Sequence, residues 1–256
     1  MKRRQRGADF LDPNVFIAAV AVFLLAGIIK GAIGLGLPTT SVGLMASLID
    51  ARLAVALVVV PMMVTNLWQI IRSGAIVRSI RRYAWFGGML AASLLLVTVI
   101  TARISGDTLA IAIGAVITIF SLTGLFLHVP ELPERFDRAA QVAGGILSGI
   151  FGGLTSIWSP PMITYFLARR LEKDEFVRAS GFLLFLGSLP LAFGYWRAGL
   201  LTGPTALTSL GMCIPAIAGF AVGEKIRALF SAERFRKAVL VFFLLMGVNL
   251  VRRAFW

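Results

Sequence analysis

Two glycine-rich segments, each followed by proline and hydroxyl residues, are the places in this sequence that favour ligand binding. The first contains Gly31, Gly34, Gly36, Pro38, Thr39, Thr40 and Ser41. The second contains Gly149, Gly152, Gly153, Thr155, Ser156, Ser159 and Pro160. Glycine permits backbone angles that other residues avoid, and proline favours the first turn of a helix. Each segment is therefore predicted to end one helix and to begin another.

A helix that begins inside a membrane offers unpaired N–H groups and a partial positive charge, which together suit an anion. The hydroxyl groups of both segments would add hydrogen-bond donors. The alternative is that glycines four residues apart let two helices pack closely, with no ligand involved. Because the same pattern occurs twice, we favour a role in lining a substrate site.

Two polar residues within apolar stretches extend this candidate site. Lys30 is the only lysine deep inside an apolar stretch, and a charged side chain in that position is costly, so it normally has a function. Lys30 is predicted to attract or bind an anion; the competing interpretation is that it reaches the membrane surface from a helix end. Asn66 is a second candidate, as a ligand contact or as an interhelical hydrogen bond.

The sequence lacks the motifs of several other chemistries. It contains no GxxxxGK[ST] nucleotide-binding loop and no GxSxG nucleophile segment. A single histidine, His128, and a single cysteine, Cys213, leave no zinc cluster and no disulfide within the chain. We therefore expect no enzyme activity, no metal site and no cofactor.

The elements that position these residues are predicted to be hydrophobic helices. Of the 256 residues, 58% are hydrophobic and 14% are charged, against roughly 25% charged in a soluble domain. Long apolar runs without alternation indicate an all-α polytopic membrane protein. A spanning helix needs about 20 apolar residues, and eight stretches approach that length: 15–36, 53–71, 83–102, 108–127, 139–158, 176–196, 204–222 and 235–251. Two shorter pieces, 38–49 and 160–168, are expected to be half-helices.

The chain also repeats itself. The run from Gly27 to Gly34 has glycines at the same spacing as the run from Gly145 to Gly152, and a short proline-led piece follows each. We therefore predict two homologous transmembrane repeats, 1–128 and 138–256, joined by the polar linker 129–137. Duplicated halves are common in secondary transporters, which bind substrate at the interface between them. An inverted arrangement is favoured, because the basic loops fall at non-equivalent places in the two halves.

The formal net charge of +13 lies mainly in the gaps between apolar runs. The segments 72–82, 169–178 and 224–237 hold thirteen basic residues, and loops of this kind normally face the cytoplasm and the anionic lipid of the bilayer. We therefore expect a multi-pass protein of the cell membrane. Nucleic-acid binding is not expected, because no basic–aromatic module of the known kinds is present.

Three motifs resemble the sulfite exporter TauE/SafE family. They are AGIIKGAIGLGLP from Ala26, GGILSGIFGG from Gly144, and SPPMITYFLARRLEKDEFVRAS from Ser159. The resemblance covers nearly the whole chain. It implies a transporter of the prokaryotic cytoplasmic membrane that moves small anions, chiefly sulfite, sulfonates and related organic acids. Leu35 and Leu37 stand where further glycines are often found in the family, so the resemblance does not specify sulfite itself.

The leading hypothesis is therefore a secondary transporter, expected to export a small anion that it holds between the two glycine-rich segments. One repeat would rock against the other to give alternating access, with a proton or ion gradient as the driver. The alternative is the permease subunit of a larger complex, in which a partner ATPase docks on the basic loop from Arg169 to Arg178. A homo-oligomer is compatible with the sequence.

Overall fold

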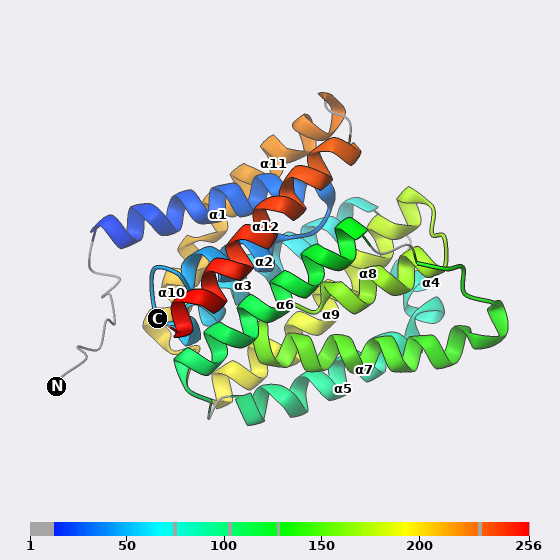
Figure 1. Cartoon of the computed structure of the whole chain (residues 1–256), viewed down its shortest axis with the longest axis horizontal. Helices are drawn as coiled ribbons and strands as arrows, with labels where there is room; N and C mark the ends of the chain where they lie inside the picture. Colours follow the sequence, from blue (N-terminus) through cyan, green and yellow to red (C-terminus); the bar gives the residue numbers. More distant parts are fainter. Residues whose placement is uncertain (1–12, 74–75, 102–103, 127–128, 230–231, 256) are drawn as a thin grey trace.

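The computed structural model describes residues 13–73, 76–101, 104–126, 129–229 and 232–255. These residues form α-helices joined by short connections, with no β-strand among them (Figure 1), so the all-α prediction is confirmed. The first half contains α1 (Pro13–Ile33), α2 (Leu37–Met45), α3 (Ala51–Ser73), α4 (Ile76–Arg82), α5 (Ala84–Thr101) and α6 (Gly106–Phe126). The second half contains the short 3-10 helix η1 (Glu134–Phe136), α7 (Asp137–Thr155), α8 (Ser159–Ala168), α9 (Lys173–Arg197), α10 (Gly203–Gly211), α11 (Cys213–Leu229) and α12 (Ala232–Phe255).

Several of these helices are long and apolar enough to cross a membrane. Within the described residues five stretches qualify: Pro13–Ile33, Ala51–Arg72, Gly106–Phe126, Glu175–Arg197 and Gly203–Ile226. Ala84–Ile100 and Val239–Arg252 are apolar but shorter. The chain is therefore a multi-pass membrane protein. Of the eight predicted spans, 83–102 and 235–251 correspond to these shorter helices, and 139–158 belongs to neither group. Its helix, α7, begins with the charged residues Asp137 and Arg138.

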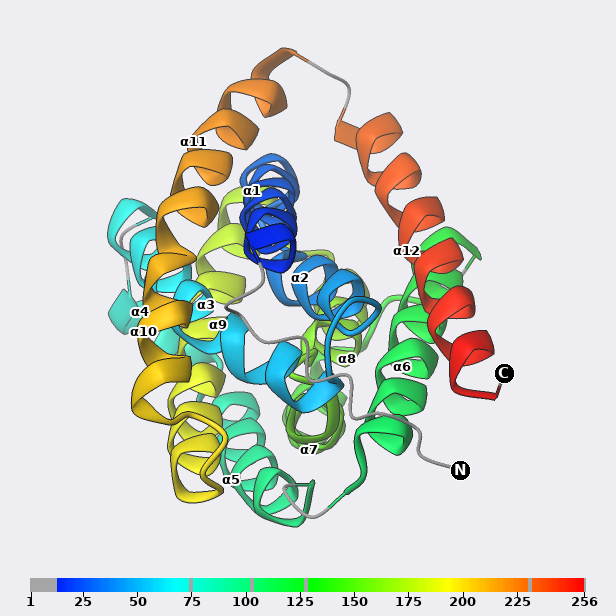
Figure 2. The ribbon, with the colours of Figure 1, turned by 90° about the vertical axis from the view of Figure 1, so that its left-hand side faces the viewer.

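Helix α1 packs closely along α11, because both present glycines at the contact. A Cβ at Gly27 or Gly31 would stand under 3.0 Å from backbone atoms of α11, and one at Gly219 or Gly223 would stand equally close to α1. Residues further along α1 contact residues further along α11, so the two helices are parallel. Figures 1 and 2 show them side by side. Small residues allow this close approach in membrane helices.

Helix α7 packs along α5 in the same manner. A Cβ at Gly145 would stand under 3.0 Å from Phe86, and one at Gly153 would stand under 3.0 Å from Val97. These contacts also advance together, so α5 and α7 are parallel to each other. Both helices lie along one side of the molecule in Figure 1.

Two ion pairs show which helix ends lie together. Arg72 at the end of α3 pairs with Glu224 near the end of α11, at 2.7 Å. Arg82, just before α5, pairs with Glu175 at the start of α9, at 3.0 Å. Helices α3 and α9 also pack against each other. Arg72 and Arg82 with their partners therefore lie at one end of the molecule, which we call the basic end. Helix α11 runs towards this end, and α5 runs away from it. Because α1 is parallel to α11 and α7 is parallel to α5, α1 and α7 run in opposite directions.

Two predicted segments differ from the structure in detail. The stretch 204–222 was expected to be one helix, but Met212 separates α10 from α11. Pro215 accounts for the interruption, because it has no N–H to donate to the carbonyl of Gly211. The loop 72–82 contains α4, a short helix that exposes Arg78 and Arg81. The predicted span ends at 102 and 127, and His128, lie outside the described residues.

Candidate functional site

The first glycine-rich segment separates α1 from α2. Gly34 and Gly36 adopt the positive φ angles of 87° and 100°, which suit glycine and strain other residues. The Gly34 N–H donates to the Lys30 carbonyl at 2.6 Å and so closes the last turn of α1. Helix α2 then begins with Leu37 and Pro38, and the Thr40 N–H donates to the Gly36 carbonyl at 2.9 Å.

The three hydroxyl residues of α2 differ in what they can offer a ligand. Thr40 donates its hydroxyl proton to the Gly36 carbonyl at 2.8 Å, and Ser41 donates to the Leu37 carbonyl at 2.6 Å. Both protons are therefore already used within the helix. The Thr39 hydroxyl is buried and has no hydrogen-bond partner within the described residues. Thr39 is thus the residue of this segment whose hydroxyl proton is available to a ligand.

The second segment separates α7 from α8. Ser156 adopts a φ of 62°, and its N–H donates to the Gly152 carbonyl at 2.7 Å. The Ser156 hydroxyl lies 3.0 Å from the Tyr195 hydroxyl of α9. The Thr155 hydroxyl donates to the Phe151 carbonyl at 2.7 Å and accepts the Ile157 N–H at 3.2 Å. The hydroxyl groups of Thr155 and Ser156 are therefore engaged with protein atoms.

The two helix starts also differ in their backbone donors. Helix α8 begins with Ser159, Pro160 and Pro161, and proline has no N–H. Two of the N–H groups that normally point out of a first turn are therefore missing from α8. Helix α2 has one proline at this position and keeps the N–H of Leu37 and of Thr39. The first segment is accordingly better suited to an anion than the second.

Lys30 and Asn66 meet beside the first segment. Lys30 is 1% exposed and Asn66 is fully buried, and the Lys30 amino group donates to Asn66 Oδ1. This contact joins α1 to α3. The Lys30 side chain is therefore enclosed by protein, which favours the interpretation of Lys30 as a buried site residue over a side chain that extends from a helix end to the surface. No acidic side chain pairs with Lys30 among the described residues, and Asn66 Nδ2 has no hydrogen-bond partner there.

The remaining predicted glycines have identifiable packing roles. Gly31 faces α11, while Gly149 and Gly153 face α5, each too closely for a side chain. A Cβ on Gly152 would approach Trp158 to 3.0 Å. These contacts fit the packing interpretation of the glycine spacing, whereas a contact with substrate stays a prediction for all four residues.

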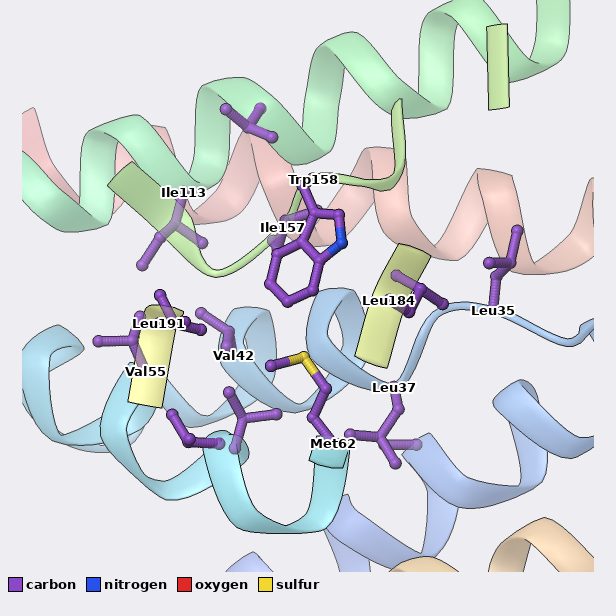
Figure 3. Close-up of a cluster of buried hydrophobic side chains, with 14 of the residues drawn as sticks. Leu35, Leu37, Val42, Val55, Met62, Ile113, Ile157, Trp158, Leu184 and Leu191 are labelled. Atoms are coloured by element: carbon purple, nitrogen blue, oxygen red, sulfur yellow. The ribbon is translucent and has the colours of Figure 1, made fainter. Parts of the chain in front are cut away.

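The space between the two segments is filled by apolar side chains. Figure 3 shows Trp158 and Ile157, from the connection before α8, over Leu37 and Val42 of α2 and Met62 of α3. Each of these five side chains is at most 1% exposed. The indole Nε1 of Trp158 is buried without a hydrogen-bond partner within the described part of the chain. A polar ligand between the two segments would therefore have to displace this cluster.

Sequence reasoning did not single out two buried polar groups next to this region. Gln69 donates to the Val177 carbonyl at 3.0 Å and to the Ser180 hydroxyl at 3.2 Å, while its Oε1 is without a partner among the described residues. Its spacing of three residues from Asn66 places both side chains on one face of α3, a signal that was present in the sequence. Trp158 could not be distinguished from an ordinary core residue.

The basic end of the molecule carries a second polar cluster. The Tyr83 hydroxyl, between α4 and α5, donates to Glu175 at 2.7 Å. Burial and this carboxylate raise the pKa of the Tyr83 hydroxyl, so it stays a neutral donor. Because Arg82 pairs with the same carboxylate, the cluster ties the first half of the chain to the second.

Comparison with known proteins gave one match. The family model described as "Sulfite exporter TauE/SafE" matches residues 19–250. No curated protein and no solved structure matched the chain. The matched residues contain both glycine-rich segments, Lys30 and Asn66.

Proposed function

The chain belongs to the sulfite exporter TauE/SafE family, and from that membership we propose that it is a secondary transporter of small anions. Sulfite, organosulfonates and related organic acids are the proposed substrates, with export across the cytoplasmic membrane as the proposed direction. The protein is a multi-pass membrane transporter, as its family and its apolar helices indicate.

One observation carries the proposal for the site: Lys30, four residues before the turn at Gly34 that leads into α2, is buried, and its hydrogen-bond partner among the described residues is the amide of Asn66. A buried cation without a counter-ion is unfavourable, and an anion bound there would supply the missing charge. The unpaired Nδ2 of Asn66 and hydroxyl of Thr39 provide further donors on the two neighbouring helices. We therefore place the substrate at the first segment, with the second as the facing wall.

The arrangement of the helices supports an inverted repeat. Helices α1 and α7 each end at a residue with positive φ, Gly34 and Ser156, whose N–H bonds to the carbonyl four residues earlier. Each is packed against a parallel helix through glycines, and the two run in opposite directions. In this proposal residues 1–128 and 138–256 are the two repeats, and the linker 129–137 joins them. Alternating access follows from one repeat moving against the other.

Transport between the repeats requires the apolar cluster of Trp158, Ile157, Leu37 and Met62 to open. In the present arrangement these side chains close the space between the two segments. Closed and open packings of the same residues are the two states that a secondary transporter needs. In this proposal the observed packing is the state in which the substrate path is shut at its centre.

Flux measurements in proteoliposomes test the function. The purified protein is reconstituted alone, and uptake of labelled sulfite and methanesulfonate is followed with and without a pH gradient. We expect anion-dependent flux that is reduced at least tenfold in Lys30→Gln. Lys225→Gln is the matched control, because Lys225 is exposed on α11. Absence of flux for every small anion tested would overturn the proposal.

The same assay decides the alternative of a permease subunit. A chain that transports anions alone in vesicles does not require a partner ATPase. In the structure Arg169 of the suggested docking loop is engaged with Asp137 at 3.1 Å and with the Leu132 carbonyl at 3.0 Å. Copurification of a soluble partner in fixed ratio, together with dependence of flux on that partner, would favour the alternative.

A further inference from the structure

The surroundings of Lys30 determine how its charge can be balanced. Its amino group is buried between α1 and α3, and the Asn66 carboxamide oxygen is its hydrogen-bond acceptor. An amide dipole compensates only part of a full charge. In a low-dielectric interior the protonated form of such an amine is costly, whereas the neutral form is not.

Among the side chains that the structure describes, the helices packed around Lys30 provide no counter-ion. Helices α2, α3, α11 and α12 contact α1. Helix α2 contains no ionisable residue, and the described ionisable residues of the other three are Arg52, Arg72, Cys213, Glu224, Lys225, Lys237 and Arg252. The one carboxylate in this group, Glu224, pairs with Arg72 at 2.7 Å at the partly exposed end of α11. The side chains of Arg227, Glu233, Arg234, Arg236 and Arg253 lie outside the described residues.

The unpaired donor of Asn66 completes the arrangement. Its Oδ1 accepts from Lys30, and its Nδ2 is buried without a partner among the described residues. A buried donor left unpaired costs about 1–3 kcal/mol. An anion placed beside Lys30 would accept from Nδ2 and would also neutralise the ammonium group. One anion would thus supply both the counter-charge for Lys30 and the acceptor for Asn66 Nδ2.

From this geometry we propose that Lys30 carries one proton with each transported anion. Lys30 is neutral when the site is empty and becomes protonated when the anion binds, and both species leave together on the other side, with export driven by the concentration gradient of the anion itself. The inference rests on the proposed anion transport and adds the coupling ion to it. The balance is simple: one monovalent anion and one proton bind, no bond other than N–H forms, and the complex gains no net charge.

Two consequences distinguish this mechanism from transport by a permanently charged lysine. A monovalent anion moves with no net charge, so its flux does not depend on the membrane potential. The flux depends instead on the pH difference between the two sides. With a permanently charged Lys30, the anion alone would cross, and its flux would follow the potential.

Methanesulfonate is the appropriate probe, because it is the anion of a strong acid and brings no proton of its own. The full-length protein is reconstituted into vesicles that contain a trapped pH-sensitive dye, with the potential clamped by potassium and valinomycin. An inward gradient of labelled methanesulfonate should acidify the interior, with one proton entering per anion. If sulfite is moved and methanesulfonate is not, the same ratio is measured with a larger organosulfonate, which likewise brings no proton of its own.

Variants of Lys30 test whether proton movement can be lost while anion flux remains. Lys30→Gln should lose proton movement, and any residual anion flux should follow the membrane potential. Lys30→Arg keeps a permanent charge and should give the same loss of proton movement. Lys225→Gln, an exposed lysine on α11, should retain the ratio of one.

The outcomes are distinguishable. Potential-driven anion flux without proton entry in the unmodified protein would overturn the inference and leave the proposed transport intact. An unchanged proton-to-anion ratio in Lys30→Gln would also overturn it. Absence of flux for all anions would remove the proposed function, and the inference with it.

Discussion

Gly31 of α1 and Phe220 of α11 meet at their backbones, so that a Cβ on Gly31 would stand under 3.0 Å from the Phe220 carbonyl oxygen. Gly223 meets the carbonyl of Ile28 in the same way from the other helix. A carbonyl oxygen within a helix cannot rotate away as a side chain can. The only response to an added methyl group is a shift of one whole helix.

We expect Gly31→Ala to destabilise the protein by about 1–3 kcal/mol, the range typical of overpacking. Gly88→Ala is the matched control, because Gly88 lies within α5 and no atom stands within 4 Å of its added Cβ. Alanine favours a helix over glycine by about 1 kcal/mol, so the control should be neutral or stabilising. Thermal unfolding in detergent measures both. Equal melting temperatures for the two variants would contradict the close packing of α1 and α11.

Gly36→Ala should destabilise the protein for a different reason. Gly36 has a φ of 100° and leads into α2, and forcing a non-glycine residue into such a conformation costs of order 1–3 kcal/mol. Gly203→Ala is the control at another helix start, since nothing lies within 4 Å of its added Cβ and its φ is not positive. A lower melting temperature is expected for Gly36→Ala alone. Anion flux should fall with it, because the strain acts at the proposed site.

The apolar helices were predictable because charged residues mark their ends. The predicted stretches 53–71 and 83–102 agree within two residues with α3 (Ala51–Ser73) and α5 (Ala84–Thr101). Hydropathy alone identifies such segments. It does not identify which helices pack together, because apolar faces are similar in sequence.

The geometry of the candidate site was predictable only in part. Lys30 and Asn66 were each singled out by their polarity, but their hydrogen bond joins residues 36 positions apart, and nothing local in the sequence specifies that pairing. Glycine spacing was ambiguous for a physical reason: a backbone turn and a helix contact both require the absence of Cβ. The structure separates the two uses, with positive φ at Gly34 and Gly36 and close helix packing at Gly31.

The stability of the basic end should depend on pH through Tyr83. Burial and Glu175 raise the pKa of Tyr83 above its ordinary value, which is about 10 in an unfolded chain. A raised pKa in the folded state means that the stabilisation is complete below about pH 10 and is lost as the pH rises further. Tyr83→Phe removes the hydroxyl, so its melting temperature should fall less steeply above that pH.

At neutral pH the same variant should lose about 1.5–3 kcal/mol, the net value of one hydrogen bond to a charged group. Glu175 keeps its ion pair with Arg82, so no buried charge is left alone. Melting curves across neutral and alkaline pH compare the variant with the unmodified protein. Parallel pH dependence in the two proteins would show that Tyr83 is not the titrating group.

Lys30 should be more important for function than for stability. Lys30→Met removes the cost of burying the amine but leaves Asn66 Oδ1 without its donor, so its loss of stability should not exceed that of Asn66→Leu, whereas anion flux should be lost. Asn66→Leu leaves the amine without its acceptor and should destabilise by about 1–3 kcal/mol. The double variant should recover part of that loss, because the two residues contact each other. Additive effects would mean that the hydrogen bond contributes nothing.

Trp158 could act through the packing of its ring or through its indole N–H. The side chain fills the space between the two glycine-rich segments, against Gly152 and Gly187, and is 1% exposed. Its Nε1 has no hydrogen-bond partner within the described residues. Trp158→Phe keeps a ring in the cluster and removes the unpaired N–H, whereas Trp158→Ala leaves a cavity.

The two substitutions should therefore separate stability from transport. Trp158→Ala is expected to cost about 3–5 kcal/mol. Trp158→Phe should cost about 1 kcal/mol, since the lost ring volume is offset by removal of a buried unsatisfied donor. If the cluster opens so that the N–H meets the anion, Trp158→Phe raises the KM for anion flux several-fold in vesicles although the protein remains folded. An unchanged KM would assign Trp158 to packing alone, and the path of the anion would then follow Lys30 and Asn66 without it.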